Sequence, residues 1–397
     1  MRICLVADVF PRLSETFVLD QALCLRDLGH AVEVLCRRDA WSTAAPAADV
    51  AALRARTRTW WGPARALERP VARLSPRWRH RASAALDLAA ARRLARCDAV
   101  VAHFGYEGAR VARLMRRVPG LPPLVTIFHG HDVATVAPEE IGALYADLFA
   151  HGARHLAVNA AFRDALVAAG APADRTSVHH TGTRIDAIPF VPRAWGAAPR
   201  TLLSVARLTE KKGIAYALRA LALVRTRRPD LDWRYTIVGD GELLAELEAL
   251  AASLGLTDRV AFLGPQPSEA VRRRLAEAEI FLLPSVTAAD GDAEGIPVSL
   301  MEAMAAGALV VSTAHSGIPE LVTGGETGLL APERDVAALA DRLLAAADMP
   351  PARRAAMAAA ARRRVERDFD VTRQTRALAR MLEDLAAGGR SAVTRPP

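Results

Sequence analysis

Short apolar runs alternate with amphipathic stretches along the first half of the chain. The runs lie at 3–7, 31–36, 99–103, 124–128, 154–158 and 177–180. The first of them is followed by a helical stretch over 17–28, which stops before Gly29, a residue type that commonly terminates helices. Strands that alternate with helices in this way predict a parallel sheet covered by helices.

A proline-rich break separates this series from a second one. Residues 187–200 contain three prolines and one glycine, a composition typical of a linker. Beyond it, apolar runs at 201–205, 234–238, 260–263, 280–283 and 309–312 alternate with helical stretches such as 213–225 and 242–254. The pattern predicts an α/β protein of two Rossmann-like domains, 1–190 and 200–365. Because open parallel sheets bind ligands at the carboxyl ends of their strands, we expect the functional residues there, in a cleft where the domains face each other.

The composition excludes several classes of protein. The chain has 397 residues, of which 51% are hydrophobic and 24% charged, which is ordinary for a folded chain of two or three domains. No run of about 18 apolar residues lacks a charge, and the first residues do not resemble a signal peptide. We therefore expect a cytoplasmic protein without a transmembrane helix, whose four cysteines, Cys4, Cys24, Cys36 and Cys97, are reduced.

The basic charge of the chain is concentrated in one stretch. The net charge is +8, and residues 51–100 hold twelve Arg against three acidic residues, a local charge of +9. Trp60, Trp61 and Trp78 lie in the same stretch. Arginines with aromatic anchors are typical of binding to an anionic membrane surface, whereas the plainer alternative is a solvated Arg-rich helix face. Nucleic acid is not favoured, because no binding motif accompanies the charge.

The two lysines of the chain are neighbours in a loop that follows an apolar run. Among 52 basic residues, Lys211 and Lys212 are the only lysines. Arg207 precedes them, and Gly213 follows them and opens a helical stretch. Arg207 and Lys212 are thus expected at a helix N-terminus, where cations and unpaired backbone N–H groups form a good diphosphate site. The alternative is a solvated basic turn.

Two further segments of the second domain carry candidate residues. Gly239 and Gly241 follow an apolar run, and glycine there lets the backbone approach a ligand closely, although an ordinary turn is the alternative. The segment 294–307 holds two carboxylates around a helix start, which can accept hydrogen bonds from polyol hydroxyls. We expect its helix to have Pro297 in the first position and to end at Gly307. The candidate residues are Glu294, Gly295, Ile296, Pro297 and Glu302.

The first domain offers candidates in three loops. His129 comes directly after the run 124–128, and a histidine at the end of a strand can contact a reacting centre. With His131 and Asp132 it could form a metal site, but no further ligand cluster of suitable spacing accompanies them. Additional candidates for donor or acceptor contacts are His103, Asp132, Ser14, Glu15 and Thr16. Alternatively, one of the last three, Ser14, Glu15 or Thr16, caps the helix that follows them.

Together these motifs resemble the family-4 glycosyltransferases of the GT-B fold, over residues 2–369. The sharpest matches are Arg207 with Lys212-Gly213, and the Glu294–Glu302 element that ends in Ala-Met-Ala-Ala-Gly. The segments 14–17, 210–213 and 284–297 are similar to exopolysaccharide enzymes of the colanic acid and amylovoran type. The resemblance implies two Rossmann-like domains that face an interdomain cleft, and a helix over 366–386 that crosses back to the first domain.

The resemblance also implies a reaction, the retaining transfer of a hexose from a nucleotide-sugar to a glycan or a lipid-linked acceptor in surface polysaccharide synthesis. No metal or other cofactor is implied. The basic stretch 51–100 would then hold the enzyme at the inner face of the membrane. The implied contacts are the donor diphosphate for Arg207 and Lys212, the ribose for Glu302, the donor sugar for Glu294, the anomeric centre for His129, and close backbone approach at Gly239 and Gly241.

Other functions share the same motifs. Enzymes of the glucan, sucrose-phosphate and trehalose types use the same donor motifs with soluble acceptors. A non-catalytic protein that binds a nucleotide-sugar as a sensor, or a GT-B-like sugar-nucleotide epimerase, would share the fold.

Overall fold

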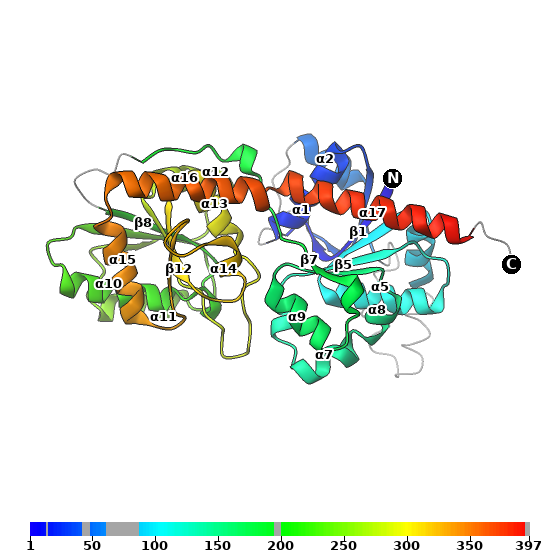
Figure 1. Ribbon diagram of the computed structural model, residues 1–397, viewed down its shortest axis with the longest axis horizontal. Coiled ribbons are helices and arrows are strands. Elements are labelled where there is room, and N and C mark those ends of the chain that lie inside the picture. Colours follow the sequence, from blue (N-terminus) through cyan, green and yellow to red (C-terminus); the bar gives the residue numbers. More distant parts are fainter. Residues whose placement is uncertain (13–14, 42–47, 61–86, 194–199, 394–397) are drawn as a thin grey trace. The chain divides into compact units, whose positions relative to one another are not determined.

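The structure, a computed structural model, describes residues 1–12, 15–41, 48–60, 87–193 and 200–393 (Figure 1). The chain divides into two compact units: Met1–His179 with Val371–Pro397, and His180–Asp370. The sequence pattern predicts a first domain that extends to residue 190. The second unit begins earlier, because His180 stacks on Phe369 and Thr183 forms a β-bridge with Asp370.

Unit 1 is built on a parallel sheet that, in the described residues, has seven strands in the order β3-β2-β1-β4-β5-β6-β7. The strands are β1 (Arg2–Phe10), β2 (Ala31–Asp39), β3 (Thr57–Thr59), β4 (Ala99–His103), β5 (Leu124–Phe128), β6 (Arg154–Ala157) and β7 (Thr176–Val178). The helices are α1 (Thr16–Asp27), α2 (Ala48–Ala55), α5 (Gly105–Arg117), α6 (His131–Ala134), α7 (Pro138–Leu144), α8 (Ala146–His151), α9 (Ala160–Ala168) and α17 (Val371–Val393), with a 3₁₀ turn η2 (Ala173–Arg175).

Unit 2 repeats this plan with six strands in the part of the chain that is described, in the order β10-β9-β8-β11-β12-β13. The strands are β8 (Arg200–Val205), β9 (Trp233–Val238), β10 (Val260–Phe262), β11 (Ile280–Leu283), β12 (Leu309–Thr313) and β13 (Leu329–Ala331). The helices are α10 (Ile214–Arg227), α11 (Leu244–Ser253), α12 (Ser268–Glu277), α13 (Val298–Ala306), α14 (Ile318–Leu321), α15 (Val336–Ala347) and α16 (Pro351–Asp368), with 3₁₀ turns η3 (Ile185–Ala187) and η4 (Glu210–Lys212).

The central strands of both sheets are buried on both faces. Every residue of β4, β5, β11 and β12 is buried, as expected for parallel strands with helices on either side of the sheet. This burial explains why these strands are near-continuous apolar runs in the sequence. The four cysteines are buried thiols.

The C-terminal helices differ from the single helix expected over 366–386. Helix α16 ends at Asp368, and α17 begins at Val371 after a short break. Helix α17 belongs to unit 1, where it lies against α1 and buries Leu378 and Leu382 (Figure 1).

The basic stretch 51–100 is described only in part. Residues 61–86, which include Trp61 and Trp78, lie outside the described residues. Trp60 is buried, its indole Nε1–H donates to Asp87 at 2.9 Å, and the Arg110 guanidinium lies over its ring. Trp60 is therefore a core residue and not the exposed aromatic anchor that the sequence suggested. No helix in the described ranges is long and apolar enough to cross a bilayer.

Candidate functional site

The loop after β8 presents one cation to solvent and buries two others. Arg207 follows the end of β8 and is exposed, and within the described residues no hydrogen bond or ion pair involves its guanidinium. The chain then forms η4 and enters α10 through Gly213, which has a φ of +67°. A cation and a helix N-terminus thus lie together at the carboxyl end of a strand, an arrangement suited to binding an anion.

Both lysines bind carboxylates of the loop over 284–297. The Lys212 ammonium lies 2.6 Å from Glu294 Oε1, and both side chains are mostly buried. The Lys211 ammonium lies 2.8 Å from Asp292 Oδ2 and is also buried. The backbone adds a third link, because the Val286 N–H donates to the Lys211 carbonyl at 2.9 Å. The two lysines therefore fix one loop to another, and the charge of Lys212 is placed directly beside Glu294.

Glu294 is an ionised carboxylate in a buried position. Its side chain is 7% exposed. Burial opposes ionisation, but the nearby ammonium groups of Lys212 and Lys211 outweigh it, so the pKa of Glu294 is lowered. Ser285 Oγ also lies 3.5 Å from Glu294 Oε1. A buried carboxylate that stays charged can accept hydrogen bonds from sugar hydroxyls without protonation competing.

Glu294 leads into a short helix whose ends match their sequence signals. Helix α13 begins at Val298, so Pro297 stands at the N-cap, one residue before the expected first position. Gly307, with a φ of +89°, ends the helix, because this left-handed conformation suits a residue without Cβ. Glu302 lies on α13 and is half-buried, and Ile296 is buried.

The backbone of the turn after β9 packs closely against another loop of the protein, the one that follows β8. A Cβ atom on Gly239 would overlap the Ala206 carbonyl oxygen, and one on Gly241 would crowd Leu208. The Leu208 N–H donates to the Asp240 carbonyl at 2.9 Å. Gly239 and Gly241 therefore hold the β9 turn against the loop that carries Arg207, and their expected contact with a ligand stays a prediction.

In unit 1, His129 pairs with His103. His103 Nδ1 lies 3.1 Å from His129 Nε2, and the ring of Phe17 lies 4.6 Å from the His129 ring. Burial, with a smaller contribution from His179, lowers the pKa of His103 to about 3. Burial and the neighbouring His103 and His179 likewise hold the pKa of His129 well below its usual value. Both imidazoles are therefore neutral at physiological pH, and the hydrogen bond between them uses the ring N–H of one and the unprotonated ring nitrogen of the other.

Asp132 shapes the loop around His129 through hydrogen bonds to backbone N–H groups. Its Oδ1 accepts hydrogen bonds from the backbone N–H groups of His129 and Gly130, and its Oδ2 accepts from Gly105 at 2.7 Å. The residue before Gly105, Phe104, has a φ of +72°, a conformation that bulky residues rarely adopt and that this carboxylate helps to hold. No group of His, Cys, Asp and Glu in the described ranges could hold a metal ion.

The loop before α1 is only partly described. Ser14 lies outside the described residues. Glu15 occupies the N-cap of α1 without a side-chain hydrogen bond to the helix, and instead pairs with Arg12 at 2.7 Å. Of the three alternatives for the cap, Glu15 therefore stands at the N-cap position without making the capping hydrogen bond. Thr16 is the first residue of α1, and its contact with a substrate stays a prediction.

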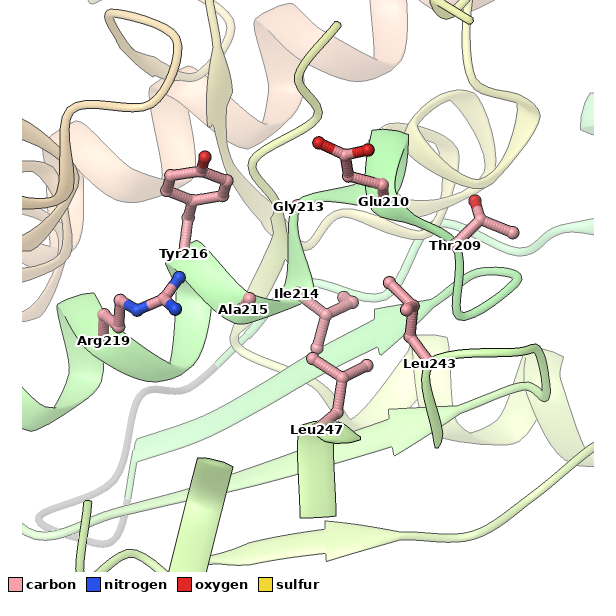
Figure 2. Close-up of a pocket in the computed structure, with 9 residues that line it drawn as sticks. All are labelled: Thr209, Glu210, Gly213, Ile214, Ala215, Tyr216, Arg219, Leu243 and Leu247. Atoms are coloured by element: carbon pink, nitrogen blue, oxygen red, sulfur yellow. The ribbon is translucent and has the colours of Figure 1, made fainter. Parts of the chain in front are cut away.

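A pocket of about 200 Å³ adjoins the loop of Arg207 and includes Gly213 at the entrance to α10. Figure 2 shows Tyr216 and Arg219 of α10 on one side of it, and Leu243 and Leu247 on another. Neither Arg207, Lys212 nor Glu294 lines it. The pocket therefore meets the candidate diphosphate site only at the start of α10.

Two residues that sequence reasoning missed contact the Glu294 segment. His315 Nε2 lies 3.1 Å from the Glu294 backbone nitrogen, and His315 Nδ1 lies 2.8 Å from Glu333 Oε2. His315 comes soon after the apolar run 309–312, the same signal that singled out His129, and that signal could have found it. Glu333 has no comparable signal, because it lies in a short polar loop after β13, a strand that was not predicted.

Comparison with known proteins matches both halves of the chain to glycosyltransferases. Residues 14–187 match the model described as Glycosyltransferase Family 4, and residues 191–364 match Glycosyl transferases group 1. Among solved structures, Anabaena HepE in complex with UDP and glucose is similar at a TM-score of 0.75 and 21% identity, over 97% of this chain and 100% of that one. Sucrose-phosphate synthase from Thermosynechococcus elongatus is similar at a TM-score of 0.73 and 20% identity, over 98% and 100%. The family matches and the fold together define a glycosyltransferase of the GT-B fold.

The sequence relatives are more specific. A colanic acid biosynthesis glycosyltransferase, WcaL of Escherichia coli K12, is 37% identical over 95% of this chain and 98% of its own. The amylovoran biosynthesis glycosyltransferase AmsK of Erwinia amylovora is 42% identical over 73% of this chain and 70% of its own. The chain therefore belongs to the family-4 glycosyltransferases, as its motifs predicted.

Proposed function

We propose that this glycosyltransferase moves a hexose, with retention of anomeric configuration, from a nucleoside diphosphate sugar to a glycan or lipid-linked acceptor in exopolysaccharide synthesis. The names of the relatives WcaL and AmsK support the pathway class. Structures of HepE with UDP and with UDP-glucose support the donor class. The observation that carries the proposal is in unit 2, where exposed Arg207 and the Lys212–Glu294 pair adjoin the entrance to α10.

The chemistry proposed for these residues is electrostatic. The bond between the anomeric carbon and the diphosphate oxygen breaks, a bond to the acceptor oxygen forms on the same face, and the acceptor proton passes to the departing diphosphate. Arg207 and Lys212 stabilise the charge that develops on that diphosphate, as preorganised cations do. Glu294 accepts hydrogen bonds from the donor sugar, and Glu302 accepts them from the ribose. His129, as a neutral imidazole, contacts the donor sugar near the anomeric carbon.

Donor binding gives the first test. A ligand that binds only the folded state raises the free energy of unfolding by about 2.7 kcal/mol at a hundredfold excess over Kd. We expect one member of a panel of UDP-, GDP-, ADP- and dTDP-sugars to raise the thermal midpoint of the full chain. Arg207→Ala should abolish that rise. Arg273→Ala is the matched control, because Arg273 is also an exposed arginine of unit 2 and pairs only with nearby Glu269 among the described residues.

Product analysis gives the second test. The chain is incubated with the donor that binds and with lipid extracts or simple glycans, and the anomeric configuration of the product is read by NMR. Transfer to a lipid-linked glycan with retained configuration supports the proposal. Exclusive transfer to a soluble sugar, an inverted product, or donor binding without turnover would each contradict it.

A further inference from the structure

His315 holds the backbone of Glu294 from the loop that follows β12. Its ring is buried, with the side chain 2% exposed, and its Nε2 lies 3.1 Å from the Glu294 nitrogen. The next residue, Ser316, donates its hydroxyl hydrogen to the Glu294 carbonyl at 2.6 Å. Both peptide groups that flank the Glu294 side chain are therefore fixed by two consecutive residues of another loop.

The contact with Glu294 determines which nitrogen of His315 carries the proton. A backbone N–H can only donate a hydrogen bond, so Nε2 must accept and carries no hydrogen. The hydrogen of the neutral ring then lies on Nδ1, which donates to Glu333 Oε2 at 2.8 Å. A carboxylate is an acceptor only, so it stabilises this tautomer and no other.

Glu333 is itself held in place. Its Oε1 accepts a hydrogen bond from the Thr287 N–H at 2.6 Å, and its Oε2 faces the Thr287 hydroxyl at 3.4 Å. Burial alone would raise its pKa, but the Thr287 N–H and His315 outweigh burial, and the pKa of Glu333 is lowered. Thr287 and Glu294 lie in the same loop. The hydrogen bonds Thr287–Glu333–His315–Glu294 therefore attach that loop to His315 and Glu333 at two separate residues.

We propose that His315 and Glu333 are positioning residues, which set the Glu294 carboxylate for the donor sugar by fixing its backbone. The proposal rests on the proposed function, since it assigns a purpose to the position of Glu294. The carboxylate already has a fixed partner at 2.6 Å in Lys212. A shift of the backbone would therefore move the carboxylate either off this cation or off the sugar. A misplacement of about 1 Å at a reacting centre can lower a rate about a hundredfold.

The test uses Glu333→Gln, which changes no volume but cannot satisfy both neighbours. If the amide oxygen accepts from His315, the amide NH₂ faces the Thr287 N–H. If the amide is turned, its NH₂ donates to His315 Nδ1, moves the ring hydrogen to Nε2, and sets it against the Glu294 N–H. We expect kcat to fall tenfold to a hundredfold, while the affinity for the nucleoside diphosphate alone stays within about twofold of wild type.

Two controls separate positioning from general damage. Glu320→Gln is matched, because Glu320 also pairs with a histidine of unit 2, His180 at 2.9 Å, but that pair does not reach Glu294. It should leave kcat unchanged. His315→Gln has a carboxamide oxygen that can accept from the Glu294 N–H, and it should retain more turnover than His315→Leu, which has a similar volume.

Nitrogen-15 NMR of the histidine rings reads the tautomer directly. The His315 resonances, assigned by their loss in His315→Gln, should show a protonated Nδ1 and a bare Nε2 in the wild-type chain. Equal kcat in Glu333→Gln and Glu320→Gln, or equal turnover in His315→Gln and His315→Leu, would overturn the proposal. A wild-type chain inactive with every donor would instead refute the proposed function, and the tautomer would still be decided by the nitrogen shifts.

Discussion

The His103–His129 pair of unit 1 is too poor in charged partners to hold a proton at physiological pH. His103 has one hydrogen-bond partner, His129, and within the described residues its Nε2 has none. An imidazolium there would lose its hydration without gaining a carboxylate as partner, because the carboxylate of nearby Asp132 accepts hydrogen bonds from backbone N–H groups instead. His129 is therefore suited to a hydrogen bond with an uncharged hydroxyl, and not to the role of a cation.

This predicts a pH profile without a His129 titration. Between pH 8 and 5.5 the carbon-13 and proton shifts of the His129 ring should stay constant, and kcat should show no inflection that His129→Asn removes. The measurement is a pH series of heteronuclear NMR spectra, with the resonance assigned from the same variant. A midpoint near 6.5 for His129 would contradict the neutral pair.

The same pKa shifts have a consequence for stability, with a definite sign. The unfolded chain binds a proton at each histidine near pH 6.5, whereas folded His103 binds one only near pH 3. The free energy of unfolding is thus unaffected by His103 above about pH 6.5. It falls as the pH drops from about 6.5 toward 3, because the unfolded chain then binds a proton that folded His103 does not. The loss approaches about 1.4 kcal/mol per pH unit for a histidine of this kind.

Sequence reasoning at the residue scale located charges better than it located their partners. Arg207, Lys212 and Glu294 could be singled out, because each follows an apolar run or precedes a helix start. Their pairing could not, since Lys212 reaches Glu294 only after the chain has passed through β9, β10 and β11. The same holds for His315 and Glu333, because the positioning role proposed for them depends entirely on hydrogen bonds between loops that are distant in the sequence.

At the scale of elements, the junction between the β8 loop and the β11 loop depends on one glycine. Gly213 adopts a φ of +67° at the entrance to α10, and a Cβ there would overlap the Pro284 carbonyl oxygen. Gly255 has nearly the same φ, +68°, but open space around it. The pair therefore separates the cost of the backbone conformation from the cost of the clash.

We predict that Gly255→Ala lowers the free energy of unfolding by about 1–2 kcal/mol, the cost of a left-handed alanine. Gly213→Ala should lower it by at least about 3 kcal/mol, because overpacking is added and backbone on both sides must move. Urea unfolding of the two variants gives the comparison. Similar losses in both would show that the β8 and β11 loops are not in the close contact described here.

Elements with continuous apolar runs were predicted well, whereas two of the four short edge strands in the described residues, β3 and β13, were missed. Strands β4, β5, β11 and β12 are buried on both faces, so their sequences carry a strong signal. All four edge strands have three residues each, a length at which the apolar pattern is a weak signal: it identified β7 and β10 but missed β3 and β13. The break between α16 and α17 was missed because both flanking sequences favour helix.

At the scale of the whole molecule, the chain completes unit 1 only with its last helix. Residues 180–370 form unit 2, and the chain then returns to unit 1 with α17. Leu378 and Leu382 of α17 are fully buried in the core of unit 1 beside α1. Each such leucine contributes about 1.5–3 kcal/mol by burial. Unit 1 should therefore depend on residues that follow unit 2 in the sequence.

A chain that ends at Asp370 tests this dependence, with a chain that ends at Ala387 as its control. The control keeps Ala386, the last residue of α17 described as buried, and should melt like the full chain. The shorter chain should lower the melting transition of unit 1 and leave that of unit 2 in place, because no residue of unit 2 has been removed. Calorimetry resolves the transitions, and limited proteolysis with mass spectrometry assigns each to a unit: early cuts should fall within 1–179. Equal melting of the two truncated chains would mean that α17 adds nothing to unit 1, and a loss confined to unit 2 would mean that the helix stabilises the wrong half of the chain.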